Sequence, residues 1–325
     1  MGRRHTGSRC IRRGDGMRVK RCVIPLAGLG TRMYPLTKVV PKALLPVIDV
    51  DGFAKPALHL MLLEAAESGI EEICLVVRPG QDEAIAGYLF DRPPPQINER
   101  LDLAHLEDQR RRLGDIVRFV FQDEPRGFGH AVYCAREFVG DNPFVVSLGD
   151  HLYRSGSKRR CIAQVVEVFE RFSISVTGLT PVEEERVRSV GIVSGRFLPG
   201  EDRILKLDRL VEKPDPSYAR ERLKIEGVEG YLGNFGIDVL TPGIFDVLER
   251  MIAETPPDSE IQLRDGMDEL IRSEGMLGYI VEGERFDIGT PSEYLKSLFR
   301  WYRSIPFIKP YLLYRYGLEP DLVSG

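Results

Sequence analysis

The chain has 325 residues, of which 43% are hydrophobic and 29% charged, and its formal net charge is −4. This length and composition are typical of a folded enzyme with one large domain or two small ones. The slight negative charge argues against nucleic-acid binding, and no apolar run is long enough to span a bilayer. Residues 1–16 are basic and lack the apolar core of a secretory signal, so we predict a disordered arm, with Met17 as an alternative start.

The five cysteines include no Cys-x-x-Cys pair; they are Cys10, Cys22, Cys74, Cys134 and Cys161. Zinc ligands usually come in closely spaced pairs, so this spacing does not support a metal site. We therefore expect small buried thiols in the reducing environment of the cytoplasm.

The first predicted element is a buried strand over residues 22–26, which leads directly into Gly28 and Gly30. Arg32 and Lys42 follow, and three prolines between positions 35 and 46 interrupt any helix. Such a loop presents free backbone N–H groups at its start and two cations further on. A polyphosphate is bound by this combination of groups.

Two familiar glycine motifs do not fit this loop. The stretch from Gly28 to Met33 lacks the third glycine of the dinucleotide fingerprint, and no uninterrupted helix follows it. A P-loop would need Gly-Lys-Ser/Thr after four spacer residues, which is absent here. A strand-to-loop turn without a ligand is the alternative, and Arg32 and Lys42 count against it.

The first half then alternates helices and strands. A helix is predicted from about residue 56 to 69, strands at 72–77, 115–121 and 143–148, and a helix at 129–139. This order predicts an α/β fold with a Rossmann-like mixed, mostly parallel sheet flanked by helices. Between Asp91 and Gly114 lies a polar insert with a charged helical stretch at 99–112, which is either a solvated helix or an oligomer contact.

The second half is richer in strands. Strands are predicted at residues 173–179, 191–194, 203–211 and 231–240, and helices near 242–252, 261–273 and 291–301. The boundary near Asp150 is soft because the sheet is expected to continue across it. We predict one domain over 17–304, made of two halves that divide at about residue 150, and a tail at 305–325.

Further candidate residues stand at the ends of predicted strands, where ligands bind in α/β sheets. Gln122 ends one strand before Gly127 and Gly129, and its carboxamide suits the edge of a nucleobase. Asp150 ends the run FVVSLGD and Asp287 lies in FDIGTP. Each carboxylate suits magnesium, and each could instead cap a turn or helix.

Glu212 and Lys213 follow a strand and precede a proline. Adjacent strand residues point to opposite sides, so a twist at the strand end is needed for both to reach one ligand. A surface ion pair is the alternative.

Together these pieces resemble the sugar-1-phosphate nucleotidyltransferases, and more closely their bacterial branch that acts on UTP and glucose 1-phosphate. The matching blocks run from about residue 23 to 298 and include LAGLGTRMYPLTKVVPKALLPV, GFGHAV, SLGD, SVGIV, LVEKP, EIQLRD and FDIGTP. His130 in GFGHAV is typical of that branch. The resemblance implies a nucleotidyltransferase, glycosyltransferase-A-like core, with a nucleotide half over about 17–150 and a sugar-phosphate half over about 151–304.

The resemblance also implies a role for each matched residue. Nucleotide binding would fall to Ala27, Gly28, Gly30, Thr31, Gln122 and Gly127. The catalytic cations would be Arg32, Lys42 and Lys213. Sugar-phosphate binding would fall to Gly191, Glu212 and Lys213. Asp150 and Asp287 would hold Mg²⁺.

The implied activity is transfer of a uridylyl group from UTP to glucose 1-phosphate by a cytoplasmic enzyme, expected to be a homo-oligomer. One block departs from the family pattern: Gly236-Ile237-Asp238 stands where Gly-Arg-Tyr is common. The sugar is therefore the open part of the assignment. The alternatives are a sibling enzyme for dTTP, CTP or another sugar, a non-catalytic regulator that binds nucleotide sugars, and a nicotinamide dehydrogenase.

Overall fold

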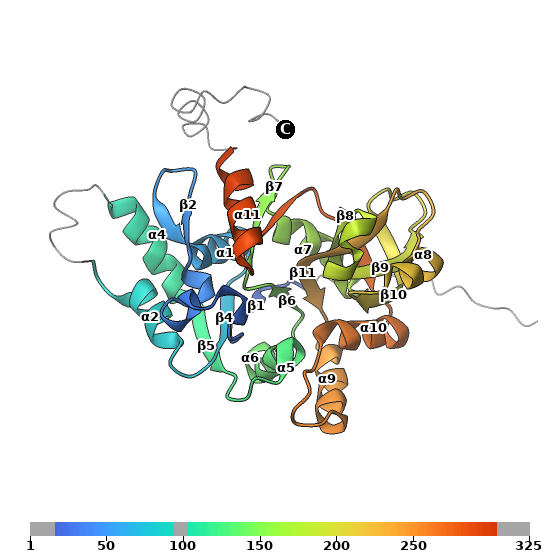
Figure 1. The fold of residues 1–325 in the computed structure, drawn as a ribbon, viewed down its shortest axis with the longest axis horizontal. Helices are drawn as coiled ribbons and strands as arrows, with labels where there is room; N and C mark the ends of the chain where they lie inside the picture. Colours follow the sequence, from blue (N-terminus) through green and yellow to red (C-terminus); the bar gives the residue numbers. More distant parts are fainter. Residues whose placement is uncertain (1–16, 94–102, 304–325) are drawn as a thin grey trace, which may run out of the picture.

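The computed structural model describes residues 17–93 and 103–303 (Figure 1). The predicted N-terminal arm, the predicted tail and part of the polar insert lie outside these ranges. Within them, no helix is both long enough and apolar enough to cross a membrane.

A nine-stranded sheet forms the centre of the described chain, in the order β5-β4-β1-β6-β11-β8-β12-β10-β9. Its strands are β1 Arg21–Pro25, β4 Glu72–Val77, β5 Val117–Phe121, β6 Phe144–Ser147, β8 Val176–Val182, β9 Gly191–Phe197, β10 Ile204–Glu212, β11 Tyr231–Leu240 and β12 Leu277–Ile280. Two antiparallel two-stranded sheets lie beside it: β2 Pro46–Ile48 with β3 Ala54–Pro56, and β7 His151–Ser155 with β13 Gly283–Asp287.

The two halves of the sheet differ in strand direction. β5, β4, β1 and β6 are parallel neighbours, as the predicted βαβ order requires. β11 runs antiparallel to both β6 and β8, and β9 pairs with both β10 and β11. The predicted α/β class with a mixed sheet is confirmed, and its antiparallel pairs are concentrated in the second half.

Helices cover both faces of the sheet. They are α1 Ala57–Ala66, α2 Asp82–Phe90, α4 Ala104–Asp115, α5 Gly127–Cys134, α6 Arg136–Val139, α7 Cys161–Phe172, α8 Pro216–Arg222, α9 Gly243–Glu254, α10 Leu263–Ser273 and α11 Pro291–Arg303. α1, α2 and α4 gather at one end of the molecule, and α8 and α10 at the other (Figure 1).

The side chains of β1 alternate between two hydrophobic cores. Cys22 and Ile24 face the core that contains α1 and α7, while Val23 faces the core that contains α5, α9 and α10. A strand that is buried on both faces consists of a continuous run of apolar residues, and this run allowed β1 to be predicted from the sequence. The cysteines at positions 22, 74 and 161 are free and buried, as expected.

Most of the predicted elements are present with small shifts at their ends. The predicted helix at 129–139 is two helices, α5 and α6, and it begins at Gly127. The sequence analysis missed α2, α7, α8, β12 and both small strand pairs. The short strands carry too few residues for a period to show.

The insert helix α4 is not a free solvated helix. Arg110 is buried and donates to the carbonyl oxygens of Tyr88 and Leu89 at 2.9 and 2.6 Å. Gln109 lies 2.9 Å from the ring nitrogen of buried His59 on α1. The helix therefore packs on its own chain, and its predicted role as an oligomer contact stays a prediction.

A buried polar network ties β8, β11 and α10 together. Asp238 on β11 forms a 2.6 Å ion pair with Arg264 on α10, and the side chains of both residues are almost fully buried. Asp238 also accepts from Thr177, at 2.5 Å, and Asn234, at 2.9 Å. Arg264 donates in turn to Asn234 Oδ1 at 2.8 Å. Each member is satisfied only while the others are present.

We expect Asp238→Ala to lower the free energy of unfolding by about 3–5 kcal/mol, because it leaves Arg264 buried without its counter-charge. Asp246→Ala is the matched control, since Asp246 pairs with Arg136 on the surface and its side chain is 77% exposed. The control should lose less than about 1 kcal/mol. Equal losses in urea unfolding would contradict the assigned network.

Candidate functional site

The parallel half of the sheet brings the predicted nucleotide residues to one edge. The loop after β1, Gln122 after β5 and Asp150 after β6 all follow the carboxyl ends of parallel neighbouring strands. The backbone N–H of Gln122 donates to Val77 O at the end of β4, at 2.8 Å, which fixes it at this edge. Ligands of open α/β sheets bind there.

The loop after β1 presents unused backbone donors. Within residues 17–93 and 103–303, the N–H groups of residues 27–30 donate no hydrogen bond. A Cβ on Gly28 would meet nothing within 4 Å, whereas Gly30 has φ +65° and its carbonyl accepts from Thr37. The loop is thus held in place by its own turn and keeps a run of N–H groups available for negatively charged ligand atoms.

The two cations of this loop have different surroundings. Arg32 is exposed. Lys42 Nζ lies 2.7 Å from Asp150 Oδ2, and His151 Nδ1 lies 2.9 Å from Asp150 Oδ1. Burial alone would raise the pKa of Asp150, but the hydrogen bond of His151 and the charge of Lys42 outweigh it and hold the pKa well below its usual range. The carboxylate is therefore ionised at neutral pH.

Asp287 is brought beside Asp150 by the pairing of β7 with β13. His151 is opposite Asp287 in that pairing, and Ile288 N donates to Asp150 O at 2.8 Å. A Cβ on Gly289 would lie 2.8 Å from Asp150 Oδ2 and 2.9 Å from Asp287 Oδ1, so both carboxylates face one small volume beside this glycine. Asp287 is not the cap of α11.

The residue that caps α11 is Thr290, whose hydroxyl accepts from the N–H of Glu293 at 3.2 Å. Asp287 Oδ1 instead accepts from Gly289 N at 2.6 Å, within its own turn. Among the described residues, none donates a hydrogen bond to the other carboxylate oxygen of Asp287, so this oxygen can bind another group.

Gln122 is buried and its orientation is fixed from behind. Its Nε2 donates to Gly127 O at 3.1 Å and lies 3.0 Å from His130 Nδ1. Burial lowers the pKa of His130, and nearby Arg126 adds to the effect, so the ring is neutral and can accept at Nδ1. Both amide hydrogens are thereby used, and Oε1 is the group that can accept from a ligand.

Gly127 and Gly129 are needed for packing inside the chain. Gly127 has φ +90°, and a Cβ on it would lie 2.8 Å from Ile261 O. A Cβ on Gly129 would lie 2.9 Å from the same oxygen, and Gly129 N donates to it at 2.8 Å. The segment at Ile261 therefore fills the space on this side of both glycines, where a side chain would otherwise lie.

The predicted sugar residues meet at the start of β9 and the end of β10. Gly191 is opposite Glu212, and a Cβ on Gly191 would lie 3.1 Å from Glu212 Oε2. Lys213 has φ +45°, a conformation that residues other than glycine seldom adopt. This left-handed conformation turns the side chain of Lys213 toward that of Glu212, and Lys213 Nζ lies 3.4 Å from Glu212 Oε1. Strained backbone of this kind is concentrated at functional sites.

The block that departs from the family pattern, Gly236-Ile237-Asp238, contacts the segment that carries Asp150. Gly236 has φ +101°, and its carbonyl accepts from Leu148 N at 3.1 Å and from the hydroxyl of Tyr153 at 2.7 Å. It therefore holds the loop that carries Asp150. Arg264, the partner of Asp238, has its Cδ 3.9 Å from a Cβ built on Gly191.

Several residues of this region were missed by the sequence analysis. His151 holds Asp150, and Gly289 leaves room for both carboxylates. Asp265 on α10 is exposed, yet partial desolvation raises the pKa of its carboxyl, and the charge of nearby Glu212 adds to the effect. The block EIQLRD, which contains Asp265, was the available signal.

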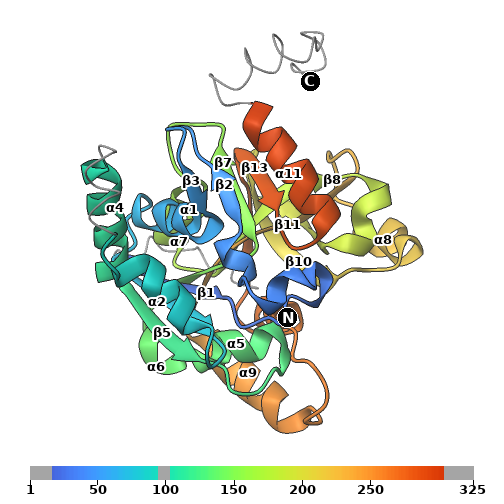
Figure 2. The ribbon, with the colours of Figure 1, turned by 60° about the vertical axis from the view of Figure 1, so that its left-hand side comes forward.

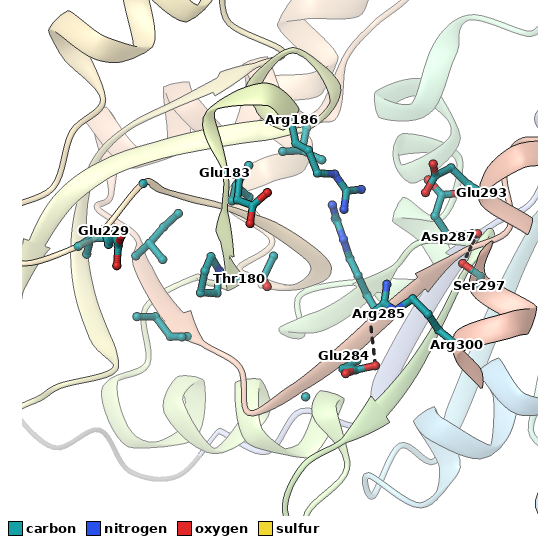
Figure 3. A pocket seen from close by; sticks show the side chains of 18 of the residues that line it. Thr180, Glu183, Arg186, Glu229, Glu284, Arg285, Asp287, Glu293, Ser297 and Arg300 are labelled. Atoms are coloured by element: carbon teal, nitrogen blue, oxygen red, sulfur yellow. Dashed lines mark hydrogen bonds and ion pairs between the residues drawn. The ribbon is translucent and has the colours of Figure 1, made fainter. Parts of the chain in front are cut away.

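A cavity of about 1360 Å³ lies between the second half of the sheet and α11, and both Val190 and Asp287 line it (Figure 3). Val190 O accepts from Lys213 N at 3.2 Å, so the sugar end borders this cavity. Figure 2 shows α11 close to β13, which ends at Asp287, and to β7, which follows Asp150.

A model of the nucleotidyl transferase family matches residues 22–299. The match spans most of the chain and both ends of the site. The chain therefore belongs to the nucleotidyl transferase family.

Relatives with assigned names point to one branch of that family. A UTP–glucose-1-phosphate uridylyltransferase of Bacillus subtilis (strain 168) is 35% identical over 277 residues, 84% of this chain and 87% of that protein. A UTP–glucose-1-phosphate uridylyltransferase 2 of Staphylococcus saprophyticus is 34% identical over 285 residues, 86% of this chain and 91% of that protein.

Two solved structures share the fold. A UDP-glucose pyrophosphorylase in complex with UDP-glucose has a TM-score of 0.72 and 27% identity, covering 88% of this chain and 99% of that chain. A UTP-bound enzyme of the same kind from Acinetobacter baumannii has a TM-score of 0.73 and 28% identity, covering 93% and 100%.

Proposed function

We propose that this chain transfers a uridylyl group from UTP to glucose 1-phosphate, giving UDP-glucose and pyrophosphate. The proposal rests on the proximity of Asp150, Asp287 and Lys42 at one edge of the sheet. At the same edge, the N–H groups of residues 27–30 donate no hydrogen bond to any described residue. The names of the relatives and of the structural neighbours support the same reaction.

In this reaction an oxygen of the sugar phosphate forms a bond to the α-phosphorus of UTP, and the bond to the leaving pyrophosphate breaks. A phosphate monoester is already ionised near neutral pH, so no general base is required. The chain contributes alignment and neutralisation of charge. Arg32, Lys42 and Lys213 are the cations assigned to the phosphates, and Thr31 and the free N–H groups would align UTP.

The base would be read by Gln122 and backbone N–H groups near Ala27, Gly28 and Gly127. Because His130 and the Gly127 carbonyl occupy the amide hydrogens of Gln122, its Oε1 would accept from the N3–H of uracil. Cytosine presents a lone pair at N3, so two acceptors would face each other. This orientation favours uracil.

The donors at Asp150 and Asp287 fit magnesium. Mg²⁺ prefers oxygen ligands and is usually held by one or two carboxylates together with substrate phosphates. Among the residues that the structure describes, no group of three or more His, Cys, Asp or Glu could hold a metal, so the two carboxylates would share the ion with phosphate oxygens. Bound there, Mg²⁺ would supply positive charge to the triphosphate.

At the sugar end, Glu212 would accept hydrogen bonds from glucose hydroxyls, Gly191 would allow the ring close to the strand, and Lys213 would bind the phosphate. A cytoplasmic location and a homo-oligomeric assembly are parts of the proposal that rest on the sequence alone.

The proposal is tested by pyrophosphate release from a panel of nucleoside triphosphates against a panel of sugar 1-phosphates. We expect UTP to exceed CTP in kcat/KM by roughly 5- to 150-fold, because the lost contact and the unpaired buried acceptor cost about 1–3 kcal/mol. The preference over dTTP should be smaller, since thymine has the same hydrogen-bonding edge. Comparable efficiency with UTP and CTP would remove Gln122 as the base reader.

Asp150→Asn keeps the shape of the side chain and removes its charge. We expect turnover to fall by about 100-fold or more at saturating Mg²⁺, because the charge that holds the ion and Lys42 is lost. A chelator should abolish wild-type turnover. The surface variant Asp246→Asn is the control, and wild-type turnover by Asp150→Asn would refute the metal assignment.

Lys213→Ala should raise the KM for the sugar 1-phosphate by roughly 10- to 150-fold, since a charged hydrogen bond contributes about 1.5–3 kcal/mol. The KM for UTP should change little. Lys206→Ala, an exposed position on the same strand, is the control. A rise in the KM for UTP with an unchanged sugar KM would reverse the assigned roles.

A further inference from the structure

Two arginines that the proposed reaction does not use project into the 1360 Å³ cavity. They are Arg186, on the 3₁₀ segment η4 Glu184–Ser189, and Arg285 on β13. Their side chains point toward each other from opposite walls (Figure 3). Arg285 and Asp287 are two residues apart on one strand, so their side chains share a face, and both residues line the cavity.

In the described part of the chain, neither guanidinium is in direct contact with a carboxylate, and Asp287 is the carboxylate whose charge acts on Arg285. Within residues 17–93 and 103–303, no carboxylate forms an ion pair with Arg186 or Arg285, although Glu183, Glu229 and Glu293 line the same cavity. The hydrogen bond of the Arg285 side chain goes to the backbone oxygen of Asn234, at 2.7 Å. Neighbouring arginines are paired: Arg188 with Asp215 at 2.7 Å, and Arg300 with Glu284 at 3.2 Å.

Two like charges that converge in a partly enclosed space repel each other unless an anion lies between them. Burial lowers the pKa of Arg285, and the charge of Arg186 acts in the same direction, while Tyr153 and Asp287 act in the opposite direction. Arginine nevertheless stays charged in proteins, so the repulsion is not relieved by loss of a proton. Paired guanidinium groups are suited to phosphate and carboxylate, each of which can accept two parallel hydrogen bonds.

We propose that Arg186 and Arg285 form a second anion-binding site at the sugar end, for an acidic group of the sugar phosphate, in addition to Lys213. The inference rests on the proposed function, because it assigns the anion to the sugar substrate. Val190 connects the arginine pair to Lys213: it lines the same cavity, and its carbonyl oxygen accepts a hydrogen bond from the backbone N–H of Lys213.

The acidic group has two possible sources with the same chemistry. One is the 1-phosphate itself. The other is a second acidic group on the sugar, as in a hexuronic acid 1-phosphate. Ligand pockets usually measure about 300–1,000 Å³. The cavity is larger than that range, so it has room for a substituent beyond the phosphate.

The test variant is Arg186→Gln, because Arg186 is exposed and its side chain makes no hydrogen bond to any residue that the structure describes. Arg188→Gln, on the same segment, is the matched control. Arg285→Gln is the second variant, with its unfolding transition measured alongside. The KM values for glucose 1-phosphate, glucuronic acid 1-phosphate and UTP are determined for each, and inorganic phosphate is titrated calorimetrically into the intact protein.

We expect Arg186→Gln and Arg285→Gln to raise the KM for at least one sugar by roughly tenfold or more, and to weaken phosphate binding, with the KM for UTP unchanged. Equal increases for both sugars mean that the arginines bind the 1-phosphate. An increase for glucuronic acid 1-phosphate alone means that they bind the second acidic group. Either result supports the site.

The site is overturned if neither sugar KM nor phosphate binding responds to Arg186→Gln, or if only the KM for UTP rises. Failure of the proposed function gives a different result: the wild-type protein then releases no pyrophosphate from UTP and glucose 1-phosphate. In that event phosphate titration of the wild type and Arg186→Gln still decides whether the arginines bind an anion.

Discussion

The antiparallel pairing of β7 with β13 sets Asp287 beside Asp150, and the rest of the site is arranged around these two carboxylates. Two negative groups that face one volume repel each other, so they need positive charge nearby. Lys42 supplies part of it in the free protein. Gly289 keeps the volume open, since any side chain there would meet both carboxylate oxygens. A metal ion and the phosphates of a nucleotide would complete the balance of charge.

Groups that contact no ligand fix the orientation of those that do. His130 holds the carboxamide of Gln122, and His151 holds Asp150. The carbonyl of Gly236 anchors the loop of Asp150 from β11. Such fixed dipoles lower the reorganisation required during reaction, which is how a site without a general base can still accelerate phosphoryl transfer.

The sugar end of the site is where this chain differs from its family. Asp238, within the departing block, is buried and paired with Arg264, so that block acts through the packing beneath Gly191. Arg186 and Arg285 face each other in the adjoining cavity, and no described carboxylate forms an ion pair with either of them. The residues proposed to bind the nucleotide keep the family pattern, so the proposed sugar end is where a different substrate would be accommodated.

The α/β class, the buried strands and the glycine-rich loop could be predicted from the sequence. A strand buried on both faces and a proline-interrupted loop are local patterns that the sequence shows directly. The sequence also identified Asp150, Asp287, Glu212 and Lys213 as candidates from their places at strand ends. Only the tertiary structure decided which groups meet. The β7–β13 pair, the packing of Ile261 against the glycines of α5 and the approach of Arg186 to Arg285 join segments far apart in the chain. No local period encodes such contacts, since they depend on how the whole sheet assembles.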